Sequence, residues 1–470
     1  MTLIFSLGEC VRLYAMTSLA QDYSEIAADN VFSEYNSYLW QNYKIMGIDL
    51  AYGSNTIGPE VLRARMQEYT QAVSNPSLGV NFTRMMISDV GVKEYALLTD
   101  DGGSGVIYQG SKYAKDNIPI SLIEEVKDRK KQVDAVEGVD LNSTVSNGKN
   151  SISSAKARQK EKYKKGEIHS IKKPEDVDDN PIKAFGKFKD MIGKGVLKSV
   201  IPDSANLSQE IVDLQKLPSG RKLNSGNKTV AQNETIIDKA LFTKYILDNF
   251  EYYGSDISHD GMKYEVEYVI AHKSTDEENL ASVVERLLAM REASNFATIM
   301  KSPKLSSQAG EVAAVLSSFA PEIYAPVKMA IIAAWAYVES VLDVRLMLQG
   351  GQVPLLKNDA QWTSDVFHLS NFLDVNKTAK DVGKGLTYKQ CLETFLMIES
   401  EKNLGLRSCD ILENAVNQQE HYENVKLDNM LYSCQLTEDF SGEEMFLSLF
   451  RGTGLEGKQY KIQKQVSRCY

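Results

Sequence analysis

The chain has 470 residues, of which 43% are hydrophobic and 25% are charged, proportions typical of a folded globular protein. These proportions exclude wholesale disorder, a collagen-like chain and a multi-span membrane protein. Its 53 Lys and Arg residues against 63 Asp and Glu residues give a net charge of -10, which argues against a general nucleic-acid binder held by phosphate contacts. Its length suits about two to three domains of ordinary size.

The first 46 residues predict a long amphipathic helix. Apolar residues recur every three or four positions from Leu3 to Met46. Such a helix would be roughly 60 Å long at 1.5 Å per residue, so we expect other parts of the chain to lie along it. Glu9 and Arg12 interrupt the apolar opening before the roughly 20 residues that a membrane span needs.

Two interpretations of Glu9 and Arg12 are open. In the first, they form an exposed i,i+3 ion pair on a cytosolic helix, where such a pair has little energetic weight. In the second, they lie at a membrane boundary, and the sequence begins inside or just after an anchor of a longer native chain.

Residues 47–126 are expected to form a part with both helices and strands. A helix is predicted from about Pro59 to Val73, since Pro suits the first turn of a helix. A hairpin is predicted after it, with VKEYALLT (92–99) as a strand, DDGGSG (100–105) as the turn and VIYQ as the return strand.

Apolar residues are scarce in the next segment, residues 127–179. Residues 156–173 carry eight Lys or Arg against two Glu. This composition is typical of a solvated or disordered insertion, which we expect here. Binding of this basic run to an anionic surface is the alternative, but Tyr163 is the only aromatic residue within the run.

The main domain is expected over residues 180–470, with antiparallel strands near the C-terminus. Its predicted helices lie near 180–203, 236–252, 277–300, 311–318, 327–348, 388–401 and 443–450. Its predicted strands lie near 262–271, 425–436 and 458–470. The fold class is therefore α+β, with a long N-terminal amphipathic helix, a helical middle (helices between 277 and 401) and antiparallel strands gathered from distant segments.

The strongest polar cluster falls on two apolar helices. Its members are Glu285, Arg286, Arg291 and Glu292 on the first helix and Glu339, Asp343 and Arg345 on the second. Glu339 and Asp343 share a helix face, so they are candidates for acid–base work or for metal ligation. A di-iron bundle would also need Glu-x-x-His motifs, and the sequence has none. We favour an ion-pair network in which Arg286 and Arg291 neutralise the two carboxylates, because a buried charge needs a partner.

No cofactor, metal or catalytic site is assigned from motifs. The five cysteines contain no CxxC pair, and no two of the five histidines lie four residues apart. GTGLEG (452–457) matches a dinucleotide-binding string, but too little chain follows it to build a βαβ unit. Ser-His-Asp arrangements are not sequence neighbours, so their absence from the spacing is weak evidence for a non-enzyme.

Several strings together resemble an uncharacterised family of Gram-positive bacteria (Firmicutes). They are LIFSLGECVRLYAM, FSEYNSYLWQNYKIMGIDLAYGS, NPIKAFGKFKDMIGKGVLKSVIPD, YEVEYVIAHKSTDEENLASVVERLLAMREASNFA, AWAYVESVLDVRLMLQGGQVPLLK and GLTYKQCLETFL. Members of this family start with a hydrophobic helix similar to that of TadE-like minor pseudopilins and accompany tight-adherence (Tad) pilus or secretion components. The resemblance extends from Leu3 to about Leu396.

The resemblance implies a single-pass membrane anchor and a large domain outside the cell. By similarity, Glu9 would close the anchor and Arg12 would face the lipid headgroups, although most of the expected anchor is absent and the chain as written is compatible with a soluble protein. The implied function is a non-enzymatic, surface-exposed structural or assembly component of a Tad-like system. Its partners would be proteins of that assembly, with self-association through the N-terminal helix and no nucleic acid.

Two alternatives stay open. The chain is an extracytoplasmic enzyme or ligand-binding domain with an unrecognised site, or it is a cytosolic scaffold if it truly starts at Met1. In an exported chain, disulfides among Cys391, Cys409, Cys434 and Cys469 are allowed, but the odd number of cysteines leaves their pairing open.

Overall fold

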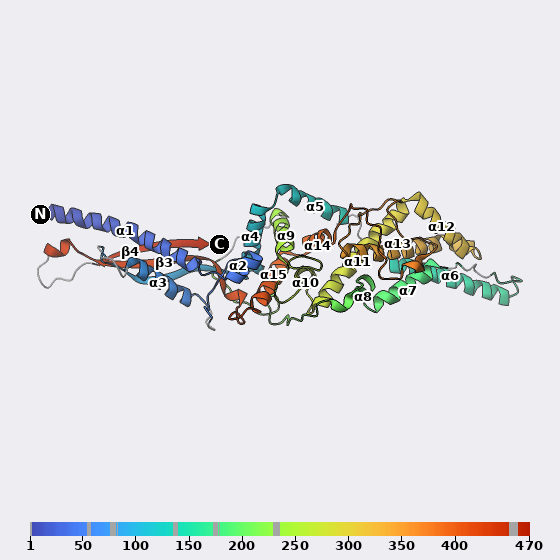
Figure 1. The fold of residues 1–470 in the computed structure, drawn as a ribbon, viewed down its shortest axis with the longest axis horizontal. Helices are drawn as coiled ribbons and strands as arrows, with labels where there is room; N and C mark the ends of the chain where they lie inside the picture. The colour runs from blue at the N-terminus through green and yellow to red at the C-terminus, as the bar shows by residue number, and fades with distance from the viewer. Residues whose placement is uncertain are drawn as a thin grey trace.

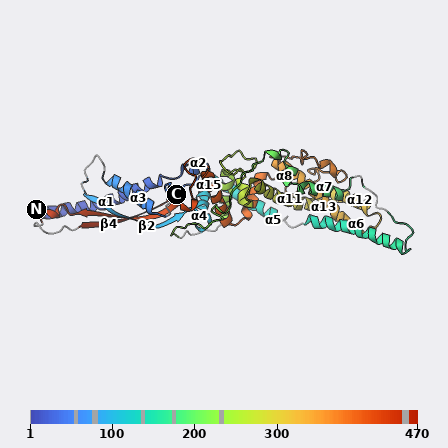
Figure 2. The same cartoon turned by 90° about the horizontal axis from the view of Figure 1, so that it is seen from below.

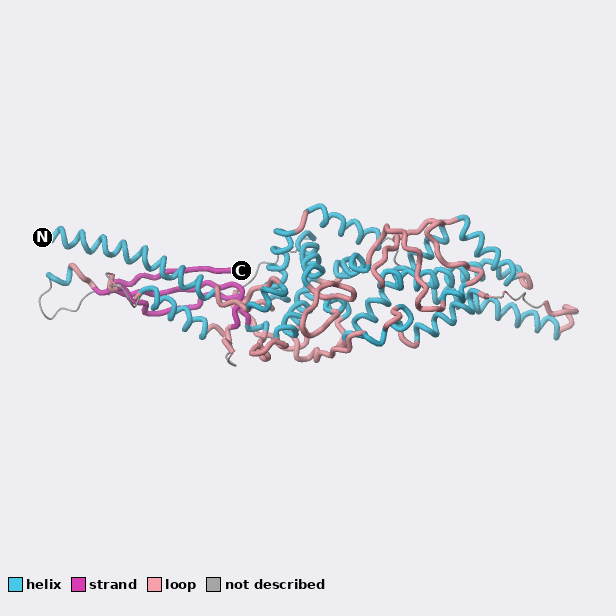
Figure 3. The backbone as a smooth tube through the Cα atoms, viewed as in Figure 1, coloured by secondary structure: helices cyan, strands magenta, loops and turns pink. Residues whose placement is uncertain are grey.

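A computed structural model describes residues 2–53, 58–75, 81, 83–134, 140–172, 177, 179–228, 236–450 and 459–470. The molecule is elongated, with a helix-and-sheet part at one end and a helical part at the other (Figure 1). Figure 3 shows that the long strands lie together in the first part. The N-terminus lies at the outer end of the sheet part, and the C-terminus lies near the junction of the two parts.

The sheet is built around one central strand from near the end of the chain. This strand, β3 (Met430–Glu443), pairs antiparallel with β1 (Ile48–Asp49), β2 (Met85–Leu97) and β4 (Gln459–Cys469). The antiparallel strands thus come from distant segments, as predicted. They also join residues of the predicted 47–126 part to residues of the predicted 180–470 part.

One face of the sheet is covered by two helices, α1 (Thr2–Phe32) and α3 (Glu60–Ser74). Alternate side chains of β3 point to this face, and Leu436 and Phe440 are buried there. The intervening residues, such as Gln435 and Thr437, are polar and half-buried on the opposite face. This alternation is expected of an antiparallel sheet with one face covered and the other facing water.

The predicted helix over the first 46 residues is broken in two. α1 ends at Phe32, and α2 (Ser37–Tyr43) follows in a different direction. Asn36 is extended and its side chain accepts a hydrogen bond from the N–H of Leu39, so it starts a new helix instead of continuing the first. The apolar spacing persists across the break because both helices bury one face.

The predicted hairpin at residues 92–105 is wrong. β2 leads into α4 (Asp100–Asn117), and its partner strand β3 comes from far along the chain. The glycine-rich string does turn the chain, because Asp101, Gly102 and Gly103 all have positive φ values. The turn begins a helix rather than a return strand, and it packs Gly103 against the backbone of Gly405.

The helical part is assembled around α13 (Tyr324–Leu348), which is buried along nearly its whole length. Its neighbours include α6 (Leu141–Lys164), α7 (Pro181–Gly193), α11 (Asp276–Lys301) and α12 (Pro303–Ser317), and Figure 2 shows them running together along the long axis. The remaining helices are α5 (Ile120–Asp134), α8 (Val196–Val200), α9 (Ile236–Asn249), α10 (Glu265–Ala271), α14 (Tyr388–Ile398) and α15 (Glu401–Val416). Short 3-10 turns lie at Ser204–Asn206, Pro321–Ile323, Leu369–Phe372, Leu427–Asn429 and Leu447–Phe450.

Further predictions differ from the structure, among them the helix expected near 443–450, where Glu443 ends β3 and Leu447–Phe450 form a short 3-10 turn. The predicted strand at 262–271 is largely helix α10, whose alternating pattern arises because Glu265 and Glu267 are buried along with the apolar residues. Their carboxylates accept hydrogen bonds from the buried hydroxyls of Tyr43 and Tyr388. The alternation of apolar and charged residues in this segment therefore does not indicate a half-exposed strand.

The predicted disordered insertion at 127–179 contains α6. Asp140 caps this helix by accepting a hydrogen bond from the N–H of Ser143. α6 then packs on α13, and its residues Val145, Gly148 and Ala155 are buried. Small residues suffice here because they let α6 approach α13 closely, as where Gly148 meets Ala330.

Candidate functional site

A cluster of fully buried charges lies between α11 and α13. Arg291 of α11 and Asp343 of α13 form an ion pair with 2.8 Å between Nη2 and Oδ2, and both side chains are 0% exposed. Asn295, one turn after Arg291, donates a second 2.8 Å hydrogen bond to the same carboxylate oxygen. The pair of Arg291 and Asp343 is one of the contacts that we expected from the sequence in the ion-pair network.

A lysine that the sequence analysis missed completes this cluster. The ammonium of Lys357, in the loop after α13, pairs with the carboxylates of both Glu339 and Asp343. The four charges of these residues and Arg291 therefore cancel. Burial alone would raise the pKa of Asp343, but Lys357 and Arg291 outweigh it and hold the pKa below its usual value. A single lysine within a loop gives no periodic signal, so the sequence could not have marked it.

Glu339 is further held by the loop that carries Lys357. Its carboxylate accepts hydrogen bonds from the backbone N–H groups of Thr363 and Ser364 and from the Ser364 hydroxyl, at 2.7–3.0 Å. The indole N–H of Trp335, one turn earlier on α13, donates to that hydroxyl at 2.9 Å. The cluster thus fixes the loop against α13, and the bonds of Glu339 leave it poorly placed to act as a free general base.

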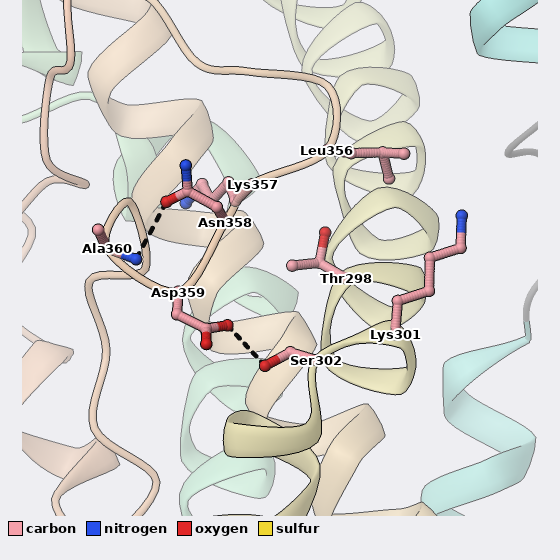
Figure 4. Close-up of a pocket in the computed structure, with 8 residues that line it drawn as sticks. All are labelled: Thr298, Lys301, Ser302, Leu356, Lys357, Asn358, Asp359 and Ala360. Carbon is pink, nitrogen blue, oxygen red and sulfur yellow. Dashed lines mark hydrogen bonds between the residues drawn. The ribbon is translucent and has the colours of Figure 1, made fainter.

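A pocket of about 520 Å³ lies beside the cluster, between the C-terminal end of α11 and the loop after α13 (Figure 4). Its lining residues are Thr298, Lys301, Ser302, Leu356, Lys357, Asn358, Asp359 and Ala360. Ser302 donates a 2.6 Å hydrogen bond to Asp359, and the Lys357 ammonium is held by the buried carboxylates. Most of its polar side chains, those of Thr298, Ser302, Lys357, Asn358 and Asp359, bond to the protein itself, which does not favour a site for a small ligand.

Arg286 and Glu285 lie outside this cluster, which corrects the predicted pairing. Arg286 is 3.5 Å from Glu399 and its guanidinium lies over the ring of Phe395 at 4.6 Å, so it does not neutralise Glu339. Glu285 is exposed on the outer face of α11. The angular positions of these residues on the helix point them away from α13.

Glu292 and Arg345 also lie outside this cluster. Glu292 is half-buried, and burial raises its pKa to about 7. Arg345 donates to the backbone carbonyls of Ser199, Phe372, Asp374 and Lys377 at 2.8–3.0 Å, and burial lowers its pKa to about 10. Arg345 therefore fastens α8 and the segment after α13 to α13 through carbonyl oxygens rather than through a carboxylate.

Glu9 and Arg12 lie on the face of α1 that meets the sheet. Arg12 donates to Glu9 and to the carbonyls of Thr83 and Glu443, and the carboxylate of Glu9 accepts the N–H of Phe446 at 2.6 Å. Both side chains are buried, so the structure directs them toward the protein and away from solvent or lipid headgroups. They fix the start of α1 to Thr83, to the end of β3 and to the residues directly after it.

The opposite face of α1 is apolar and exposed. Leu3, Ile4, Leu7, Val11 and Tyr14 are between 64% and 84% exposed. At 100° per residue, these five positions fall within about a third of the helix circumference. Within the described part of the chain, α1 is the one helix that is long and apolar enough to cross a membrane by length and composition.

A Ser-His-Asp grouping unites three distant segments. The Oγ of Ser219 is 2.9 Å from Nε2 of His272, and Asp410 is 3.7 Å from the same nitrogen. In a catalytic triad the acid binds the other ring nitrogen and orients the imidazole. Here Asp410 is held instead by the N–H of Ser219 and the hydroxyl of Tyr268, both at 2.8 Å. The grouping ties a loop to α10 and α15 and lacks the geometry of a proton relay.

The described residues give little support for a metal site or a reactive thiol. They contain no group of three or more His, Cys, Asp or Glu side chains placed to hold a metal ion. All five cysteines are described and carry free thiols. Burial raises the pKa of the Cys391 and Cys434 thiols to about 12, so neither is an activated nucleophile.

One comparison with known proteins gives a match. A model of a family of unknown function, DUF5702, matches residues 171–442, more than half of the chain. No curated protein and no solved structure matches. The matched region contains the buried charge cluster and most of the helical part, together with nearly all of β3.

Proposed function

The chain belongs to the DUF5702 family of unknown function, and from that premise we propose that it is a non-enzymatic structural or assembly component held at a membrane by its N-terminal helix. Its main domain lies outside the cell and contacts other proteins of a tight-adherence (Tad)-like pilus or secretion system. The Tad-like setting rests on the resemblance of the sequence strings given above.

The observation that carries this proposal is the two-faced character of α1. One face is fixed to the sheet by Glu9 and Arg12, and the opposite face exposes Leu3, Leu7 and Val11 to the surroundings. A contiguous exposed apolar stripe is unfavourable in water and marks a membrane or protein contact. The stripe lies at the extreme end of a long molecule, where it can enter a bilayer without burying the rest of the chain (Figure 1).

The charge cluster supports a structural role for the helical part. Arg291, Lys357, Glu339 and Asp343 neutralise one another inside the protein, so their charges fasten helices and a loop together. A molecule with an apolar end and a rigid body beyond it suits a component that holds its partners at a distance from a membrane.

The test is protease accessibility on intact cells producing the chain with a C-terminal tag. We expect external protease to degrade the tag, and we expect the protein to stay with the membrane fraction after an alkaline wash. Protection of the tag in a soluble cytoplasmic fraction would instead support the cytosolic scaffold and overturn the proposal.

A set of substitutions links the result to the apolar stripe. The variant carries Leu3→Asn, Leu7→Asn and Val11→Asn. The matched control carries three equivalent changes of exposed apolar residues elsewhere, Ile211→Asn, Met300→Asn and Leu356→Asn. We expect the first variant to leave the membrane fraction and the control to remain there. Equal retention of both would show that α1 is not the anchor.

The Tad-like part of the proposal has its own test. Deletion of the gene should reduce surface pili or Tad-dependent secretion, and the unaltered gene should restore it. An unchanged pilus count and unchanged secretion would refute this part while leaving the membrane attachment to be judged by fractionation.

A further inference from the structure

Lys357 meets two carboxylates in the interior of the helical part. Its ammonium contacts Oδ1 of Asp343 and Oε1 of Glu339. The side chains of both acids are 0% exposed, and that of Lys357 is 2% exposed. An amine and a carboxylic acid are the two reactants of amide formation, and a fold that holds them side by side supplies a large part of the activation free energy of the reaction through proximity.

The two oxygens of the Asp343 carboxylate have different surroundings. Oδ1 faces the nitrogen of Lys357, whereas Oδ2 accepts hydrogen bonds at 2.8–3.0 Å from Nε and Nη2 of Arg291 and from Nδ2 of Asn295. Donors fixed in this way stabilise the negative charge that develops on an oxygen when a nucleophile attacks the carbon that bears it. The surroundings therefore suit Oδ2 as the oxygen that remains in an amide and Oδ1 as the oxygen that departs.

Glu339 is in place for the proton transfers that such a reaction needs. Its hydrogen bonds from Thr363 and Ser364 make it unavailable to a substrate from outside, but its Oε1 contacts the nitrogen of Lys357. A carboxylate in hydrogen-bonding contact with an amine can act as general base toward the nitrogen and then as general acid toward the departing oxygen. The buried cluster thus contains a nucleophile, an electrophile and a proton carrier.

We propose that Lys357 and Asp343 condense into an intramolecular amide (isopeptide) bond after the helical part has folded. The bond from Nζ to Cγ forms, and the bond from Cγ to Oδ1 breaks. Two of the three ammonium protons pass through Glu339 to Oδ1, which leaves as water, and the third stays on the amide nitrogen. Glu339 ends as it began, so the reaction consumes no oxidant, reductant or second substrate.

The product removes two buried charges and leaves the other groups paired. An ammonium and a carboxylate become a neutral amide, which relieves the cost of holding both ions away from water. The amide oxygen keeps its hydrogen bonds from Arg291 and Asn295, and the amide N–H faces Glu339. The charges of Arg291 and Glu339 still cancel. The pocket of about 520 Å³ that Lys357 lines has room for the released water.

The experiment is intact-mass measurement and peptide mapping of the purified full chain under denaturing conditions. We expect a mass lower by one water molecule than the sequence requires. Trypsin should fail to cleave after Lys357, so the peptides 329–345 and 346–377 should be recovered as one branched species. Fragmentation of this species should place the link between Asp343 and Lys357.

The test variant is Glu339→Gln, which keeps the shape of the side chain and removes the proton carrier. We expect it to retain the full mass and to be cleaved after Lys357. Glu285→Gln, an exposed change in the neighbouring helix, is the matched control and should form the bond. Formation of the bond in Glu339→Gln to the same extent as in the unaltered chain would overturn the proton transfer assigned to Glu339.

The unaltered chain decides the question even if Glu339→Gln does not fold. The full mass with normal cleavage after Lys357 would overturn the proposal, and so would a loss of water without the branched peptide. The measurement involves no membrane, so its outcome is independent of the anchor proposed above.

Discussion

Asp343 shows how a charge is accommodated in the centre of the helical part. Its carboxylate receives Arg291 and Lys357 from different elements, and Asn295 binds it as well. Removal of one cation would leave an unpaired charge in a site with no exposed surface. The remaining side chains could not turn to water without opening the contact between α11 and α13.

Substitution Arg291→Ala should therefore destabilise the protein by about 3–5 kcal/mol, the usual cost of breaking a buried pair by removing one partner. The measurement is denaturant or thermal unfolding followed by circular dichroism. Glu285→Ala, on the exposed face of the same helix, is the control and should change stability little. Equal midpoints for the two variants would contradict the structural role of the pair.

Glu292 makes stability depend on pH in a predictable direction. Its pKa is raised from 4.5 to about 7 by burial, with Lys189 and Asp140 acting on it as well. The folded state binds this proton more tightly than the unfolded state, so the contribution to stability is present below pH 4.5 and is lost as the pH rises to about 7. The Glu292→Gln variant should thus gain melting temperature over the unaltered protein at pH 8 and gain little at pH 4.5. Glu285→Gln is the control, and a similar gain at both pH values would contradict the assignment to Glu292.

At the scale of elements, the contact between α6 and α13 depends on one glycine. A Cβ atom on Gly148 would lie 2.3 Å from the Cβ of Ala330 and 3.0 Å from the carbonyl oxygen of Pro326. Both neighbours belong to the backbone or stem of α13 and cannot rotate away. The two helices pack this closely only because position 148 has no side chain.

Gly148→Ala should therefore destabilise the protein even though Ala favours helix by about 0.8–1 kcal/mol over Gly. Gly186→Ala is the matched change in α7, where a Cβ would meet nothing within 4 Å, and it should be neutral or stabilising. Thermal unfolding distinguishes the two. A stabilising effect at both positions would show that α6 does not pack against α13 as described.

Whether a helix or strand could be predicted from the sequence depends on whether the polarity of its residues matches their burial. α11 and α13 were predicted to within a few residues, because long apolar runs with polar ends signal a buried helix. α10 was predicted as a strand, since burial of Glu265 and Glu267 hides the usual link between charge and exposure. α15 (Glu401–Val416) was not predicted at all, although Ser400 caps it by accepting the N–H of Asn403. Local signals of this kind are weak where tertiary contacts decide the outcome.

The candidate site was predictable to a similar degree. Spacing placed Glu339 and Asp343 on one helix face and identified Arg291 as a partner. It could not find Lys357, because a loop residue reaches the cluster through the path of the chain after α13. It also assigned Arg286 to the wrong carboxylate, since the relative rotation of two helices is not encoded in either sequence alone.

At the scale of the whole molecule, the elongated arrangement predicts its behaviour in solution. A compact domain of this length would have a radius of gyration of about 23 Å. We expect small-angle X-ray scattering of the monomer to give a clearly larger value, because the sheet part and the helical part lie end to end (Figure 1). A value near that of a compact sphere would contradict this arrangement.

The pairing of β2 with β3 has a consequence for synthesis. Roughly 330 residues separate the end of β2 from the start of β3, and at about 5–20 residues per second a ribosome takes roughly 15–70 seconds to make them. During that interval the backbone groups of β2 that pair with β3 lack their native partner, although α1 and α3, which cover the apolar face of the sheet, are already made. The nascent chain therefore carries an aggregation-prone strand until its last segment emerges. A chaperone that shields β2 would act on the nascent chain and would have no role once the C-terminal strands have paired.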